Sequence, residues 1–69
     1  MGDHILKNRI KIHRAIKNLT QEQLAELVKV TRTTINSVER RHFVPSTILS
    51  LRIARVFGVP VEEVFYLDE

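Results

Sequence analysis

Five polar side chains recur at helical spacing between residues 32 and 40, and none of them is acidic. They are Arg32, Thr33, Asn36, Ser37 and Arg40. Residues three or four positions apart lie on one face of a helix, so these side chains would share a single surface. Each can form a hydrogen bond with a base edge or a phosphate. The pattern therefore predicts a surface that binds nucleic acid without covalent chemistry.

Groups that could perform catalysis or hold a metal ion are scattered along the chain. His4, His13 and His42 fall in separate segments with no pair four residues apart, and the sequence contains no Cys. We therefore expect no metal site, because protein zinc sites draw on clustered His and Cys ligands. No serine has a base at a recognisable spacing, and there is no glycine-rich phosphate loop. We predict that the protein is not an enzyme and uses no cofactor, and the sequence implies no small-molecule ligand.

Two short helices joined by a tight turn would position the polar surface. Thr20 can cap a supporting helix over residues 21–28, and Gln23 stands three residues further on, which is the spacing of a capping box. Thr31 can cap a second helix over residues 32–40. The apolar residues that give these helices inner faces are Leu24, Leu27, Val28, Ile35 and Val38. A helix with a polar outer face, braced by a second helix across a short turn, is the physical requirement of a DNA-reading helix-turn-helix.

The stretch from Thr20 to Arg40 resembles the helix-turn-helix of the phage-repressor/Cro family, often called the Xre family of transcription regulators. The matching residues are Gln21, Ala25, Val30, Thr31, Ile35, Val38 and Glu39. The resemblance continues through Pro45 and Ser46 and through residues 52–59 to residues 62–65. It implies a compact all-α domain of five helices that carries the helix-turn-helix and binds double-stranded DNA in a sequence-specific manner.

Two turn positions that this family usually fills with Gly hold Lys29 and Arg41. Such positions favour a positive φ, which costs a non-glycine residue roughly 1 kcal/mol or more. The turn geometry and the stability of the motif therefore depend on how the chain accommodates Lys29 and Arg41, which the sequence leaves open.

The remaining segments predict three further helices in one domain that spans residues 1–69. The first, over residues 4–17, carries two apolar stripes, and we expect the second stripe to meet the last helix. That stripe consists of Ile5, Ile12 and Ile16. Ser46 can cap a further helix that Gly58 closes. This helix is apolar nearly all round, which predicts the buried spine of the domain. Pro60 opens a short fifth helix.

Charge is unevenly distributed over the chain, whose net charge is +3. Residues 1–58 contain all 11 Lys and Arg and four acidic residues, whereas residues 59–69 contain four acidic residues and no base. A basic body with an acidic end suits a protein that places one side against a polyanion. No apolar run reaches the roughly 20 residues of a membrane span, and the N-terminus lacks the apolar core of a signal peptide. We therefore expect a cytoplasmic protein with no membrane contact.

Arg14 and Glu39 are charged residues at inward-facing positions. Arg14 stands one turn after Ile10, and Glu39 stands one turn after Ile35. An unpaired charge in a core is very unfavourable, so the two side chains should pair. In the family that the sequence resembles, the matching Arg and Glu form such a pair and brace the recognition helix. We interpret this pair as structural.

The resemblance also implies that the second helix of the motif enters the major groove of DNA. The expected base-reading residues are Arg32, Thr33, Asn36 and Ser37. Arg32 can pair bidentately with guanine and Asn36 with adenine. The expected phosphate-binding residues are Gln21, Thr31, Arg40, Arg41 and His42.

A homodimer is expected because one recognition helix reads too few base pairs to select a single genomic site. Two copies would read a palindromic operator whose half-sites lie about one helical turn apart. The expected dimer contact is the apolar end of the chain, formed by Val61, Val64, Phe65, Tyr66 and Leu67. The alternative is that these residues cover the core of a single chain.

Two other functions remain open. The protein could be an antitoxin that binds a toxin and regulates its own gene. Known antitoxins often carry an extra segment for the toxin, and this sequence ends almost at the fifth helix, which favours the transcription regulator. It could also be a controller protein of a restriction–modification system, which would share the fold and the DNA binding.

Overall fold

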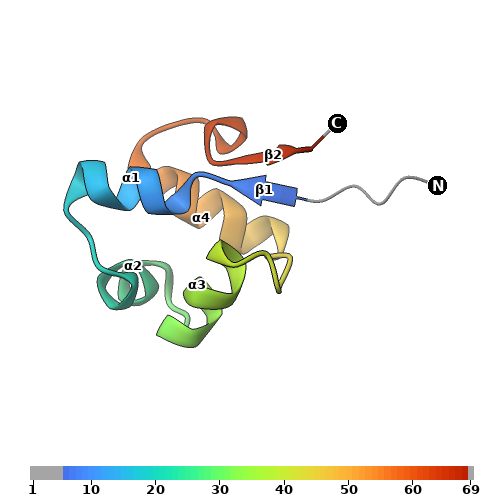
Figure 1. Ribbon diagram of the computed structural model, residues 1–69. Coiled ribbons are helices and arrows are strands. Elements are labelled where there is room, and N and C mark those ends of the chain that lie inside the picture. The colour runs from blue at the N-terminus through green and yellow to red at the C-terminus, as the bar shows by residue number, and fades with distance from the viewer. Residues whose placement is uncertain (1–5, 69) are drawn as a thin grey trace.

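The fold consists of four α-helices and a small antiparallel sheet within residues 6–68, the range that the computed structural model describes. In chain order the elements are the strand β1 (Leu6–Asn8), the helices α1 (Ile10–Lys17), α2 (Gln21–Val28), α3 (Arg32–Glu39) and α4 (Thr47–Phe57), the 3-10 turn η1 (Val61–Glu63) and the strand β2 (Phe65–Leu67). The strands pair with Leu6 opposite Leu67 and Asn8 opposite Phe65. The two ends of the described chain therefore lie side by side (Figure 1).

Side-chain caps define the starts of three helices. The hydroxyl of Thr20 accepts a hydrogen bond from the backbone N–H of Gln23 at 3.0 Å, and Gln23 Oε1 accepts one from the backbone N–H of Thr20 at 2.9 Å. Thr31 and Ser46 cap α3 and α4 by accepting similar bonds at 3.2 and 3.1 Å. These caps satisfy backbone N–H groups that have no partner inside a helix. The predicted starts of α2, α3 and α4 are confirmed.

The hydrophobic core is formed by one side of each helix and by the C-terminal segment. Its buried side chains are Ile10, Leu24, Ala25, Val28, Ile35, Val38, Leu49, Ile53, Ala54, Phe57, Val64 and Phe65. α4 packs against α1, α2 and η1, while α3 packs mainly against α2. Since α3 contributes only Ile35 and Val38 to the core, apolar packing holds this helix at few points.

The predicted first helix over residues 4–17 is wrong in its N-terminal part, because Leu6–Asn8 forms β1 and α1 begins only at Ile10. Residues 4 and 5 lie outside the described range. The side chain of Asn8 marks the change of structure. Its Oδ1 accepts a hydrogen bond from the N–H of Ile10 at 3.2 Å, and its Nδ2 donates one to the Val38 carbonyl at 3.0 Å. Asn8 thus contacts the first residue of α1 and ties β1 to α3.

The predicted fifth helix is also wrong, and the all-α class with it. Pro60 is followed by the single 3-10 turn η1, after which the chain extends into β2. Val64 is fully buried and Phe65 is 8% exposed, so both side chains complete the core while β2 pairs with β1. Pairing with a distant strand and burial override the local helical pattern. Between residues 6 and 68 the fold is therefore four α-helices plus a two-stranded sheet.

Several apolar side chains that were predicted to be buried are largely exposed. Leu27, which was assigned to the inner face of α2, is 57% exposed. In α1, Ile12 and Ile16 are 58% and 68% exposed, so these side chains face solvent rather than the last element. Ile5, the third member of that stripe, lies outside the described residues. In α4, Ile48 and Leu51 are 64% and 53% exposed, so this helix is buried on one side only. Exposed apolar residues of this kind are common on folded proteins.

Left-handed backbone conformations occur at three non-glycine residues of the described chain. They are Asn18, Lys29 and Arg41, with φ values of 58°, 65° and 64°. Asn adopts this conformation more readily than Lys or Arg, because its short polar side chain can hydrogen-bond locally. Lys29 and Arg41 stand at the two positions that the family usually fills with Gly, after the two helices of the motif, and both adopt the positive φ that such positions favour.

Replacing Lys29 by Gly should stabilise the protein, because Gly adopts a positive φ without the steric penalty of a Cβ atom. The expected gain is about 1 kcal/mol, which raises the melting temperature of a small domain by roughly 4–8 °C. Lys11→Gly is the control, since Lys11 lies inside α1, where Gly should lower stability by about 1 kcal/mol. Thermal unfolding followed by circular dichroism measures both changes. A Lys29→Gly protein that melts at or below the wild-type temperature would contradict the prediction.

Candidate nucleic-acid interface

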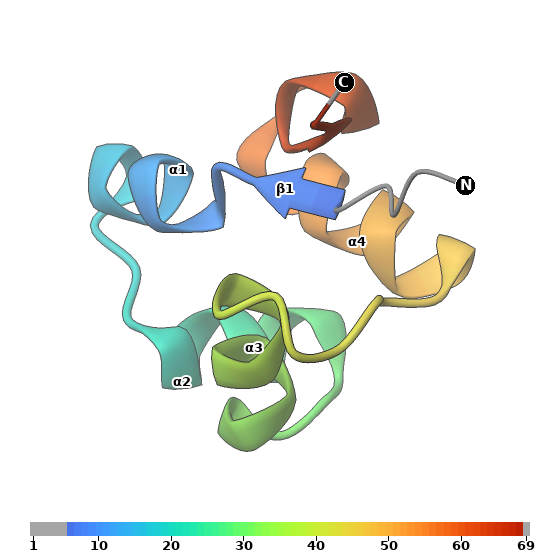
Figure 2. The same cartoon turned by 45° about the vertical axis from the view of Figure 1, so that its right-hand side comes forward.

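The helix-turn-helix presents the polar side of α3 to solvent. Residues 29–31 join α2 to α3, and two views place these helices on the side of the molecule away from β2 (Figure 1; Figure 2). Arg32 and Thr33, in the first turn of α3, are exposed, whereas Ile35 and Val38 are buried. The first turn of α3 is therefore accessible to a large partner.

The predicted base-reading residues differ in exposure. Arg32 and Thr33 are exposed, and Asn36 and Ser37 are half-buried. Because residues four positions apart lie one above the other on a helix, the four side chains form two short rows along α3. The row of Arg32 and Asn36 leads toward the start of α2, where Asn36 contacts Gln21.

Most of the predicted phosphate-binding residues lie at the two ends of α3. Thr31 precedes the helix, and its hydroxyl is engaged in the cap because it accepts the N–H of Thr34. Arg40, Arg41 and His42 follow the helix and are exposed. Two positive charges therefore stand beside the C-terminal end of α3.

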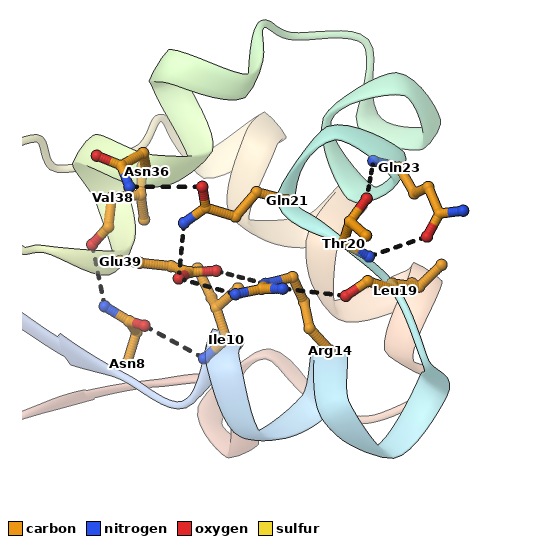
Figure 3. A network of polar contacts seen from close by, with 10 residues as sticks. All are labelled: Asn8, Ile10, Arg14, Leu19, Thr20, Gln21, Gln23, Asn36, Val38 and Glu39. Atoms are coloured by element: carbon orange, nitrogen blue, oxygen red, sulfur yellow. Dashed lines mark hydrogen bonds and ion pairs between the residues drawn. The ribbon is translucent and has the colours of Figure 1, made fainter.

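Gln21 connects the predicted phosphate-binding residues to the predicted base-reading residues. Its Nε2 donates a hydrogen bond to Glu39 Oε1 at 3.1 Å, and its Oε1 accepts one from Asn36 Nδ2 at 3.4 Å (Figure 3). The sequence predicted separate roles for Gln21 and Asn36, which are 15 positions apart, and gave no sign of this contact. Because Nε2 carries two N–H groups, one remains beyond the bond to Glu39.

Arg14 and Glu39 form an ion pair at the centre of the polar network in Figure 3. Arg14 Nε and Nη2 donate to the two carboxylate oxygens of Glu39 at 2.6 and 3.2 Å, and Arg14 Nη1 donates to the Leu19 carbonyl at 3.0 Å. The two side chains are only 15% and 9% exposed. The pair connects α1 to the end of α3, and Gln21 adds the start of α2 to the same carboxylate.

The residues predicted to form a dimer contact are divided between the core and the surface. Val64 and Phe65 belong to the core of the single chain, so their side chains leave little surface for a partner. Val61 and Tyr66 are half-buried, and Leu67 is 51% exposed. Of the five residues, Leu67 is the most accessible to a second copy.

Leu67 continues an apolar surface that the sequence reasoning missed. Its strand partner Leu6 lines a surface cavity together with Phe43 and Val44, which are 49% and 70% exposed. We call Leu6, Phe43, Val44 and Leu67 the lateral surface. Adjacent apolar residues in the polar loop after Arg41 were the signal that could have revealed it.

The histidines do not converge on a common site. His13 stacks on Phe57 with ring centroids 5.2 Å apart, and its Nε2 lies 3.3 Å from the Glu63 carbonyl. His42 is exposed, and His4 lies outside the described residues. Within residues 6–68, no group of three or more His, Cys, Asp or Glu side chains is placed to hold a metal ion. None of the helices in that range has the length and apolar character needed to cross a lipid bilayer.

The chain is similar to known proteins over most of its length. A family model described as helix-turn-helix matches residues 10–64. An uncharacterized HTH-type transcriptional regulator of Methanocaldococcus jannaschii is 42% identical over 64 residues, which cover 93% of this chain and 97% of the relative. The control protein C.SmaI of Serratia marcescens is 45% identical over 58 residues, which cover 81% of this chain and 69% of the relative. The crystal structure of a Bacteroides fragilis protein, described as a putative DNA-binding protein, superposes with a TM-score of 0.79 at 26% identity, covering 88% of this chain and 98% of that one.

Replacing Glu39 by Ala should strongly destabilise the protein, because Arg14 would keep its charge in a nearly enclosed site without a partner. We expect a loss of about 3 kcal/mol in the free energy of unfolding, the lower end for a buried pair, since Arg14 retains some solvent contact. Glu26→Ala, which removes an exposed acid from α2, should change stability by less than about 0.5 kcal/mol. Urea unfolding measures both variants. Equal urea midpoints for Glu39→Ala and the wild type would show that the pair adds nothing to stability.

Proposed function

The chain belongs to the helix-turn-helix family, and from that premise we propose that it regulates transcription by binding a specific site in double-stranded DNA as a homodimer. The observation that carries the proposal is the exposed, polar and non-acidic first turn of α3, on a helix braced by α2 and by the Arg14–Glu39 ion pair. Relatives that are named as HTH-type transcriptional regulators support the same function.

Arg32 is the proposed reader of guanine. It is exposed in the first turn of α3, and a guanidinium can donate two parallel hydrogen bonds to O6 and N7 of guanine in the major groove. Thr33 beside it can offer its methyl group to thymine or its hydroxyl to either partner. Asn36 and Ser37 lie one turn further along, and an Asn carboxamide matches the N6 and N7 edge of adenine. Each good bidentate contact discriminates against a wrong base by about 1–3 kcal/mol.

Contacts with phosphates would orient α3 without reading sequence. The proposed contacts are Gln21, Thr31, Arg40, Arg41 and His42. Among these, Arg40 and Arg41 carry the positive charge, and the chain as a whole has a net charge of +3. Charge of this sign on the protein favours DNA binding that weakens as salt concentration rises, because bound phosphates release counterions.

Dimerisation is part of the proposal, because a single α3 contacts too few base pairs to select one genomic site. Since Val64 and Phe65 are in the core, we assign the contact to the exposed Leu67 and the rest of the lateral surface. The loop that carries Phe43 and Val44 follows α3 directly. A two-fold contact at this surface would have to leave the first turns of both α3 helices facing the same side of the DNA.

A second candidate function shares this DNA-binding surface. The 45% identity to control protein C.SmaI favours a controller of a restriction–modification system as the alternative. The two functions differ in genetic setting rather than in chemistry. A restriction endonuclease gene beside this one, with the selected DNA site upstream of it, would favour the controller.

Selection of bound fragments from random DNA tests the proposed function directly. We expect the wild-type protein to select a palindromic site, and Arg32→Ala to lose the preference for one base pair in each half-site, because Arg32 reads a base. The affinity for the preferred site should fall by about 1–3 kcal/mol. Arg41→Ala is the control, since loss of a phosphate contact should weaken binding to all sequences alike. An unchanged motif for Arg32→Ala would show that the base-reading assignment is wrong.

Replacing Leu67 by Asp should give a folded monomer, because the side chain is half exposed and a charge there opposes apolar contact with a second copy. Leu27→Asp is a matched control, since Leu27 is 57% exposed on α2 and lies outside the lateral surface, and this variant should remain dimeric. Phe65→Asp should instead unfold the chain, because Phe65 belongs to the core. Sedimentation equilibrium with circular dichroism decides the matter. A wild-type protein that stays monomeric at micromolar concentration would defeat the dimer proposal.

A further inference from the structure

The carboxylate of Glu39 can only accept hydrogen bonds while it is ionised. Three donors converge on it, two from Arg14 at 2.6 and 3.2 Å and one from Gln21 at 3.1 Å. Because the guanidinium is always charged, Arg14 can only donate hydrogen bonds, and the Glu39 carboxylate at the centre can only accept them. The Arg14–Glu39 pair therefore determines which groups donate and which accept in the rest of the network.

The Glu39 carboxylate also fixes the orientation of the Gln21 carboxamide. The two ends of a carboxamide have nearly the same shape, so an amide side chain can be turned over at little steric cost unless its partners distinguish oxygen from nitrogen. Glu39 makes that distinction, because only Nε2 of Gln21 can donate to it. Gln21 Oε1 must then point away from Glu39 and toward α3, where it accepts the hydrogen bond from Asn36 Nδ2 at 3.4 Å.

Asn36 receives its orientation in the same way. Its nitrogen faces Gln21, and in Figure 3 its carboxamide oxygen points away from Gln21. One N–H and the oxygen remain for another partner. The residue is half-buried and stands one turn after the exposed Arg32, on the side of α3 proposed to face the groove.

We propose that Gln21 is a positioning residue that fixes the carboxamide of Asn36 in the orientation that reads adenine. An oxygen acceptor beside an N–H donor matches the N6 donor and N7 acceptor of adenine, whereas guanine offers only acceptors at the corresponding atoms. The hydrogen bonds that connect Arg14, Glu39 and Gln21 determine which way the oxygen and the nitrogen of the Asn36 carboxamide point. This inference rests on the proposed function, since it concerns the same surface.

The orientation of the Asn36 carboxamide depends on the Gln21 side chain. At 3.4 Å, the bond from Asn36 to Gln21 is the longest in the network, and hydrogen bonds of this length are weak. The orientation of Asn36 therefore depends on Gln21 being held in place by Glu39. Removal of the Gln21 carboxamide should leave the Arg14–Glu39 pair and the fold intact while freeing Asn36 to turn over.

The first test uses the protein without DNA. Gln21→Met keeps the length of the side chain and removes both polar atoms. Gln23→Met is the matched control, because it removes a carboxamide from the same helical turn, and that carboxamide contacts Thr20 rather than Asn36. The heteronuclear NOE of the Asn36 side-chain amide, measured by nitrogen-15 NMR, reports its mobility. We expect this NOE to fall in Gln21→Met and to stay at the wild-type value in Gln23→Met. An Asn36 amide unchanged by Gln21→Met overturns the positioning role.

The second test compares the DNA sites selected by the same variants. Asn36→Ala should lose the preference for adenine at one base pair of each half-site by roughly 5- to 150-fold, the discrimination of a bidentate contact. Gln21→Met should reduce the preference at the base pair read by Asn36 and leave the preference at the base pair read by Arg32 unchanged. Gln23→Met should leave the whole motif unchanged. The inference is overturned if Gln21→Met selects the same motif as the wild type. It is also overturned if the base pair whose preference depends on Asn36 is not an adenine position. A wild-type protein that selects no site overturns the proposed function and the adenine assignment together, while the NMR result still decides whether Gln21 orients Asn36.

Discussion

The ion pair between Arg14 and Glu39 is the interaction on which the arrangement of the helix-turn-helix depends. A chain of 69 residues has a small core and a narrow margin of stability. Within that core, α3 is anchored by only two apolar side chains, Ile35 and Val38. The ion pair adds a third anchor at the C-terminal end of α3. Because both charges are nearly enclosed, the helix cannot shift without leaving one of them unpaired.

The same constraint joins folding to recognition. The Glu39 carboxylate meets side chains from α1 and from the start of α2, so three helices converge on one group. Binding sites require side chains that are held to within about 0.5 Å of their working positions. A polar centre beneath α3 meets this requirement through residues such as Gln21, while Arg32 and Thr33 remain exposed. Stability and the proposed base contacts therefore use different atoms of the same short helix.

Much of the helical structure could be predicted because its signals are local. Thr20, Thr31 and Ser46 cap their helices through bonds that span three residues, and such spacings are visible in the chain. The sheet could not be predicted in this way. β1 and β2 contain three residues each and lie at opposite ends of the described chain, so neither has a pattern of its own. Their pairing becomes favourable only when burial of Phe65 closes the core.

The candidate site shows the same division. The local sequence was sufficient to place Arg32 and Asn36 on one face of a helix, because helical spacing depends on neighbouring residues alone. It was also sufficient to expect a partner for Glu39, since a charge directed at a core requires one. The packing of α2 against α3 was needed to bring Gln21 between Asn36 and Glu39, and the closure of the sheet was needed to place Phe65 inside rather than on a dimer surface. These contacts join residues far apart in the chain, and their geometry exists only once the helices have packed.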